Sequence, residues 1–69
     1  MDRKRVNSSK IRSIGYDEKN MVLEIEMSNR QVFQYSKVYT EVYRRFMAAP
    51  NPTSFFDDKI LEEYSSKRV

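Results

Sequence analysis

The side chains of this sequence that could do chemistry are cations, carboxylates and aromatic rings, because its 69 residues include no histidine and no cysteine. The usual general bases, thiol nucleophiles and zinc ligands are therefore missing. The adjacent carboxylates Asp57-Asp58 and Glu62-Glu63 could form a metal site, but a solvated acidic helix face is the stronger interpretation. A single glycine, Gly15, excludes a Gly-rich phosphate loop. We expect no enzyme activity, no metal and no cofactor.

Basic residues gather near both ends of the sequence and at one point in the middle, within a formal net charge of +3. Clusters of this kind can neutralise phosphates, so they are the candidate nucleic-acid contacts. The plainer interpretation is a solvated tail and solvated helix faces, and composition alone favours it. The candidates are Arg3, Lys4, Arg5, Lys10, Arg12, Arg44, Arg45, Lys67 and Arg68.

The rings of Phe33 and Tyr35 form a second candidate site. They are one residue apart, so on a strand both rings point to the same face of the sheet. On an open face they would form a platform on which bases stack. Under a helix they would belong to the core, and the spacing of the surrounding apolar residues favours the core.

Three strand-like segments must position these side chains: residues 10–16, residues 21–27 and the segment that begins at Val32. Residues 21–27 alternate, with apolar residues on one face and Glu24 and Glu26 on the other, which we expect to meet water. Residues 17–20 have the composition of a four-residue hairpin loop. Gly15 indicates a bulge or a close backbone contact within the first strand.

The turn at residues 28–31 sets the register of the second hairpin. A two-residue loop would place the rings of Phe33 and Tyr35 on the wet face. A three-residue loop would pair Phe33 with Ile25 on the apolar face and would require a left-handed backbone at Arg30. Burying two rings recovers several kcal/mol against about 1 kcal/mol for that backbone. The sequence favours the buried register.

Beyond Val38 the apolar period becomes helical. Thr40 or a neighbour is expected to cap a helix that runs to about Ala49, before Pro50. Ser54 begins a weak capping box for a second helix that ends near Tyr64. Residues 65–69 are expected to form either a tail or a short added strand.

The predicted fold class is α+β, a three-stranded antiparallel β-meander followed by two short helices packed on one face. Residues 1–9 are expected to form a flexible basic N-terminal arm, and residues 10–69 a single domain. No apolar run is long enough for a membrane span or a signal peptide, so we expect a cytoplasmic protein without membrane contact.

The sequence resembles the KTSC domain, a small bacterial and phage family named from a C-terminal extension of some lysyl-tRNA synthetases. Phe33-Gln34-Tyr35 corresponds to the Tyr-x-Tyr centre of the family, and Arg30 and Thr53 stand where glycine is usual. The function of the family is unknown, and the resemblance implies RNA binding only through the link to a synthetase. The matching segments are residues 8–17, 23–27, 32–35 and 38–46, with Phe56, Ile60 and Tyr64.

We therefore expect a small non-catalytic binding module, with RNA or another nucleic acid as the partner. One alternative is a protein-interaction or self-association module, because the core is small and a three-stranded sheet has open edges. Another alternative is a binder of a small nucleotide or other ligand, for which a pocket lined by tyrosines and arginines would be the sign.

Overall fold

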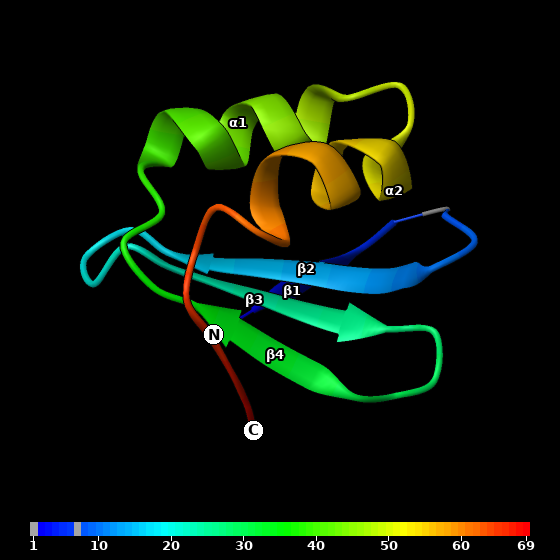
Figure 1. The fold of residues 1–69 in the computed structure, drawn as a ribbon, viewed down its shortest axis with the longest axis horizontal. Coiled ribbons are helices and arrows are strands. Elements are labelled where there is room, and N and C mark those ends of the chain that lie inside the picture. The colour runs from blue at the N-terminus through cyan, green and yellow to red at the C-terminus, as the bar shows by residue number, and fades with distance from the viewer. Residues whose placement is uncertain (1, 7) are drawn as a thin grey trace.

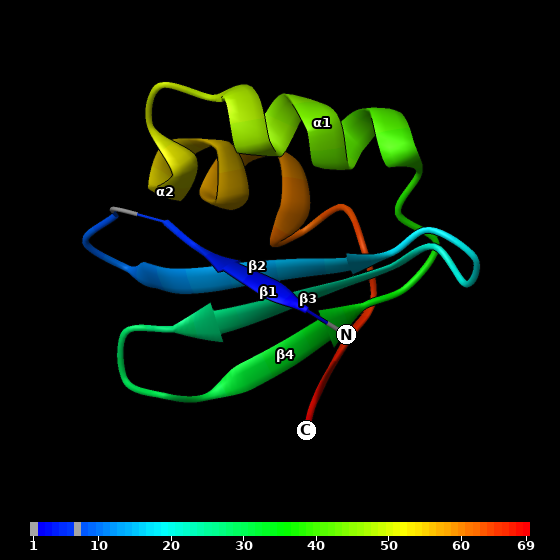
Figure 2. The same cartoon turned by 180° about the vertical axis from the view of Figure 1, so that it is seen from behind.

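A layer of helices covers one face of an antiparallel sheet in the computed structural model, which describes residues 2–6 and 8–69 (Figure 1). Seen from behind, the opposite face of the sheet has no helix over it (Figure 2). In chain order the elements are β1 (Arg3–Arg5), β2 (Ile11–Asp17), β3 (Val22–Met27), β4 (Val32–Tyr35), α1 (Thr40–Ala48), α2 (Pro52–Phe55), η1 (Phe56–Ile60) and β5 (Ser66–Arg68).

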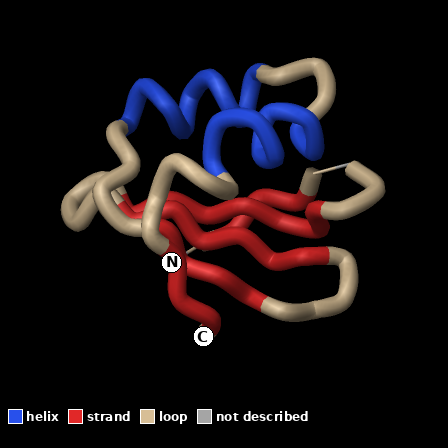
Figure 3. Tube along the Cα trace, in the orientation of Figure 1, coloured by secondary structure: helices blue, strands red, loops and turns tan. Residues whose placement is uncertain are grey.

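Within the described residues the sheet has five strands in the order β1-β2-β3-β4-β5, so neighbours along the chain pair in space (Figure 3). The α+β class is confirmed, whereas the expected number of three strands is wrong. The two additional strands are the edges β1 and β5, each three residues long and made of exposed residues. They have no apolar alternation, and backbone pairing with β2 and β4 is what orders them.

Edge strand β1 also changes the expected domain organisation. Arg3, Lys4 and Arg5, predicted to lie in a flexible arm, pair with Gly15, Ile14 and Ser13 and so belong to the same sheet as the rest of the chain. Met1 and Asn7, which the prediction placed in the same arm, lie outside the described residues. At the other end, the alternative of a short added strand in residues 65–69 is confirmed as β5.

The second hairpin has the buried register. Phe33 pairs with Ile25 and Tyr35 with Leu23, and the loop closes with a hydrogen bond of 2.9 Å from the Arg30 amide to the Met27 carbonyl. Arg30 has φ 72°, the left-handed conformation that the three-residue loop requires. Tyr35 is only 2% exposed and Phe33 packs, partly buried, against the core.

Arg30→Gly is expected to stabilise the domain by about 0.5–1 kcal/mol, because glycine adopts a positive φ without the steric cost of a Cβ atom. Urea unfolding followed by circular dichroism measures the change. The matched control is Gln31→Gly, the next residue, which is also exposed and has no positive φ. This control should lower stability, and an equal loss in both variants would contradict the strained turn.

A bulge interrupts β2 at Arg12. Ile11 pairs with Met27 and Ser13 pairs with Glu26, so Arg12 is an extra residue without a partner on β3. This corrects the expectation that Gly15 marks the bulge. The reason is that Ile11 and Ile14 are both fully buried although they are three residues apart, which a regular strand does not allow.

Helix α1 ends close to the predicted position, at Ala48, whereas η1 ends at Ile60, before the expected end of the second helix near Tyr64. In α1 the cap position is Tyr39, whose side chain forms no capping hydrogen bond. The second helix begins earlier than Ser54, because Asn51 accepts a hydrogen bond from the Ser54 amide and Pro52 occupies the first turn. The helix then widens into the π-helical turn η1, where the Leu61 amide donates to the Phe56 carbonyl at 2.9 Å.

The core lies between the sheet and the helix layer. Tyr35 meets Phe56 edge to face, with ring centroids 5.8 Å apart, and this contact joins β4 to η1. Tyr16 stacks on Tyr43 of α1 at 4.7 Å and donates to the Val38 carbonyl at 2.5 Å. The fully buried members are Ile11, Ile14, Leu23, Ile25, Tyr35, Val38, Phe46, Phe56 and Ile60.

Alkaline pH is expected to destabilise the fold through Tyr35. Burial raises the pKa of its hydroxyl above the ordinary value of 10.0, although a hydrogen bond with Ser66 acts in the opposite direction. A raised pKa means that the unfolded chain loses this proton first, so stability falls as pH rises above about 10. Thermal unfolding from about pH 8 to about pH 11 should show a smaller loss in Tyr35→Phe than in the unmodified protein. Tyr39→Phe, at a 65% exposed position, is the control and should leave the pH dependence unchanged.

Candidate functional site

The face of the sheet that the helices leave uncovered, here called the open face, is polar. The register aligns one row of residues across all the described strands: Arg3, Gly15, Glu24, Gln34 and Lys67. Because alternate residues of a strand share a face, the neighbouring row consists of Arg5, Ser13, Glu26 and Val32.

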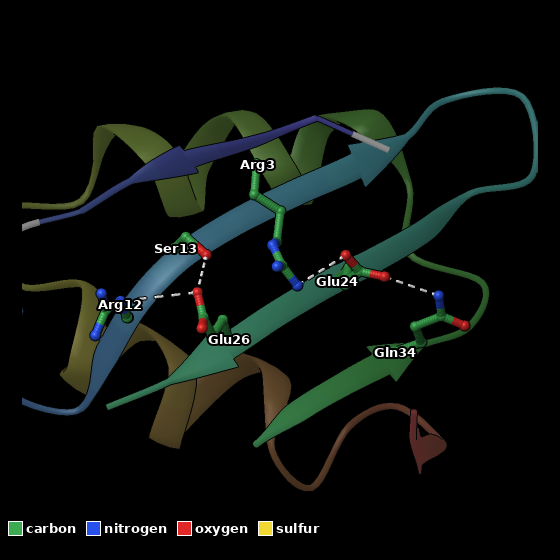
Figure 4. Close-up of polar contacts among 6 residues, drawn as sticks. All are labelled: Arg3, Arg12, Ser13, Glu24, Glu26 and Gln34. Atoms are coloured by element: carbon green, nitrogen blue, oxygen red, sulfur yellow. Dashed lines mark hydrogen bonds and ion pairs between the residues drawn. The ribbon is translucent and has the colours of Figure 1, made fainter. Parts of the chain in front are cut away.

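Arg3 reaches across β2 to β3 over the position of Gly15 (Figure 4). Its Nη1 donates to Oε2 of Glu24 at 3.1 Å, and Glu24 is only 14% exposed. Gly15 is buried beneath this contact and has no side chain to obstruct it. Gly15 therefore leaves room for a side chain to cross β2, a role that differs from the bulge or close backbone contact predicted for it.

Glu24 and Glu26 hold the polar groups of the open face in place. The second oxygen of Glu24 accepts a hydrogen bond of 2.9 Å from Gln34 on β4. Oε1 of Glu26 accepts from the Ser13 hydroxyl at 2.9 Å and lies 4.0 Å from Nε of Arg12 (Figure 4). The bulge explains why Arg12 and Ser13, adjacent in sequence, both reach the same carboxylate.

Gly15→Val is expected to detach β1 from the sheet, because a branched side chain would occupy the space between Arg3 and Glu24. Hydrogen exchange of the Val6 amide, which donates to the Arg12 carbonyl at 3.1 Å, reports this directly. We expect exchange to accelerate by about 10-fold, equivalent to about 1.4 kcal/mol of local stability. Gly15→Ala, with a single methyl group, should have a smaller effect. Unchanged protection in the valine variant would contradict the proposed role of Gly15.

A shallow hollow of about 400 Å³ opens on this face between β1 and the bulge of β2. Arg3, Arg5 and Arg12 line it together with Asp2, Ser13 and Glu26. The three guanidinium groups exceed the two carboxylates by one charge, and all three arginines are exposed residues. Such an arrangement can receive an anion, because arginine presents several N–H donors in a plane that matches phosphate oxygens.

The other basic residues predicted to contact nucleic acid do not line this hollow. Lys67 lies on the open face at the far edge, whereas Lys4 and Arg68 pair with Ile14 and Phe33, on the helix side. Lys10 is bound to Asp57 at 2.9 Å, with its Nζ 5.5 Å from the centre of the Phe56 ring. Arg44 and Arg45 are exposed on α1, where Arg45 forms an ion pair with Glu41.

The aromatic residues Phe33 and Tyr35 also lie on the helix side of the sheet, paired with Ile25 and Leu23. They are therefore not arranged as a platform on the open face. The residues that sequence reasoning missed are Ser13 and Gln34, which hold the two glutamates. The spacing of Ile11 and Ile14 was the available signal, because it requires a bulge that brings Arg12 and Ser13 to one face.

The spacing of the acidic side chains and the length of the helices bear on metals and membranes in residues 2–6 and 8–69. In this part of the chain no three acidic side chains are close enough together to hold a metal ion. No helix within it has the length and apolar character needed to cross a membrane.

Comparison with known proteins identifies the family. The KTSC domain model matches residues 7–64. The chain is similar to the crystal structure of a KTSC domain protein from Yersinia pestis, with a TM-score of 0.96, 35% identity, and coverage of 99% of this chain and 96% of that chain. An uncharacterized protein of Stutzerimonas stutzeri (strain A1501) is 37% identical over 49 residues, which is 71% of this chain and 69% of that protein. The chain therefore belongs to the KTSC domain family.

Proposed function

We propose that this domain is a non-catalytic module that binds RNA through the sugar-phosphate backbone, with Arg3, Arg5 and Arg12 as its main contacts. The observation that supports this proposal is the hollow on the open face, where two strands bring these three arginines together. They come from β1 and from the bulge of β2, so the arrangement depends on the folded sheet.

The ion pairs of the open face orient the arginines for this role. Arg3 is 31% exposed and Arg12 45% exposed, so both keep donors available to solvent while Glu24 and Glu26 hold their side chains over the sheet. A guanidinium has more N–H donors than one carboxylate occupies, so Arg3 and Arg12 can contact a phosphate while they remain paired with the largely buried carboxylates of Glu24 and Glu26. A guanidinium held in place also loses less conformational entropy on binding.

The chemistry of the open face also predicts how specific the binding is. The aligned rows of the described strands place charged, amide, hydroxyl and aliphatic groups on this face, and Phe33 and Tyr35 lie on the other one. Phosphate contacts position a protein on nucleic acid without reading its sequence. We therefore expect weak sequence preference together with a strong dependence on salt.

Fluorescence anisotropy with a labelled single-stranded RNA and a labelled hairpin, at two salt concentrations, tests the proposal. Three phosphate contacts predict that log K falls with log salt with a slope of about −2 for the single strand. Dissociation constants weaker than millimolar at low salt, or affinity that does not depend on salt, would rule the proposal out.

Self-association, the alternative expected from the open edges, is less favourable in this geometry. Both edge strands are basic, with Arg3-Lys4-Arg5 at one edge and Lys67-Arg68 at the other. Pairing any two of these edges would bring like charges together, which is a common device against edge-to-edge association. Light scattering tests the alternative, and a strict monomer would count against it.

A further inference from the structure

A second hollow, of about 350 Å³, is lined by residues of the helix layer and of the segment that follows it. The helix layer covers the face of the sheet opposite to the open face (Figure 1). Val42 and Arg45 of α1 line one side of the hollow, and Phe55 of α2 and Lys59 of η1 line the other. Glu63 and Tyr64, which follow η1, complete the wall. We call this hollow the helix groove. Its volume falls at the lower end of the range for small-molecule sites, about 300–1,000 Å³.

The walls of the helix groove include two aromatic rings whose positions are fixed. Phe55 stacks on Phe46 with ring centroids 5.4 Å apart and planes 13° from parallel. Tyr64 is half-buried and packs against the core. The side chain of Val42 adds an aliphatic surface between the helices. A flat heterocycle in this hollow would contact these rings, and stacking on an aromatic side chain favours the binding of any base.

Two cations, Arg45 and Lys59, lie at the same hollow. Arg45 is bound to Glu41 at 2.8 Å, but both side chains are more than two-thirds exposed, at 70% and 72%. An exposed pair one helical turn apart has a small net free energy, so a phosphate can take the place of Glu41. The carboxylate of Glu63 is an acceptor for an amino group of a base or a hydroxyl of a ribose.

The helix groove continues in both directions. A neighbouring hollow shares Phe55 and Lys59 with it, and another shares Glu63 and Tyr64 and adds Lys37. A ligand seated on the rings therefore has room to extend along the surface past a further cation.

We propose that the helix groove binds a nucleotide, with the base on Tyr64 and Phe55 and the phosphate on Arg45 and Lys59. Rings and cations side by side match the two halves of this ligand class, the flat base and the anionic phosphate. The ligand can be a free mononucleotide or the terminal nucleotide of an RNA, because both have the same chemistry. This site does not depend on the arginines of the open face.

The test is a titration of the full chain with AMP, GMP, CMP, UMP and ribose 5-phosphate, followed by the amide resonances of the protein. We expect AMP to shift the amides of Val42, Arg45, Lys59 and Tyr64, and ribose 5-phosphate to bind at least about 5-fold more weakly, since it lacks the base. Arg45→Ala should weaken AMP binding by about 5-fold, the size expected for one exposed charge-assisted contact. Arg44→Ala, its neighbour on α1 outside the hollow, should change the affinity by less than about 2-fold.

The source of the ligand is distinguished by a second arm with a short RNA that has either a 5′-phosphate or a capped, blocked end. If AMP and the phosphorylated RNA shift the groove amides equally and the blocked RNA does not, the groove recognises the terminal nucleotide of an RNA. If AMP alone shifts them, the ligand is a free nucleotide. Any one of four results would overturn the proposal. These are shifts confined to the open face, equal affinities for AMP and ribose 5-phosphate, equal losses in the two arginine variants, and no shift at millimolar AMP. Removal of the open-face arginines should leave AMP binding intact, which separates this test from that of the RNA proposal.

Discussion

The triple variant Arg3→Gln, Arg5→Gln and Arg12→Gln is expected to bind single-stranded RNA about 100-fold more weakly at low salt while keeping its fold. Each arginine that loses its phosphate contact costs about 1 kcal/mol, and three of them amount to about two decades in affinity. Glutamine removes each charge and keeps a polar side chain on the open face, while the backbone pairing of β1 with β2 that orders this part of the sheet is left in place. Anisotropy titration measures the affinity, and circular dichroism verifies the fold.

The control for this variant removes the same charge elsewhere. Lys19→Gln, Lys37→Gln and Arg44→Gln change three exposed cations outside the hollow of the open face. If the arginines act as a local site, this control should lose no more than about 3-fold in affinity, which reflects the change in net charge. Equal losses in the two triple variants would mean that binding depends on total charge and not on the open face.

Phe56→Ala is expected to unfold most of the protein at physiological temperature. Phe56 is fully buried, contacts Tyr35 edge to face at 5.8 Å and lies beneath the ammonium group of Lys10. Truncating a buried phenylalanine costs about 3–5 kcal/mol, which is comparable to the whole stability of a small domain. Urea unfolding at low temperature, where the variant remains folded, measures the loss.

Leu61→Ala is the comparison for this prediction, because Leu61 follows η1 but is 45% exposed. Its truncation should change stability by no more than about 0.5 kcal/mol. If both variants lose stability equally, η1 does not anchor the helix layer to the sheet through Phe56.

The central part of the fold follows from sequence patterns that have a direct physical cause. Alternation in residues 21–27 and the position of Phe33 and Tyr35 predict the β3–β4 hairpin, its buried register and the left-handed Arg30. The free energy gained by burying two rings exceeds the cost of one left-handed residue, and this difference decides the register. The start of α1 at Thr40 was predictable for a similar reason, the change to a helical apolar period.

The edge strands were not predictable in the same way. Arg3–Arg5 and Ser66–Arg68 have no apolar face, and their order comes from backbone hydrogen bonds to β2 and β4. Composition therefore indicated a mobile arm for the first of them. The consequence for the candidate site is large, because pairing of β1 with β2 is what places Arg3 and Arg5 beside Arg12.

The bulge lies at Arg12 and not at Gly15, for which the sequence suggested either a bulge or a close backbone contact. A glycine in a strand often marks a bulge, which made Gly15 the natural choice. The stronger signal was Ile11 and Ile14, two core residues whose odd spacing requires an extra residue between them. The nine basic candidates were identified as a set from the sequence, but their division between the open face, the helix side and α1 depends on register and could not be predicted.

The most direct test of the central claim is a map of backbone amide shifts on addition of a short single-stranded RNA with blocked ends. We predict that the largest amide shifts occur on the open face and that they diminish as salt is raised. The amides concerned are those of Arg3, Arg5, Arg12 and Ser13. Changes confined to α1 and η1, with the amides around the hollow of the open face unmoved, would contradict this prediction.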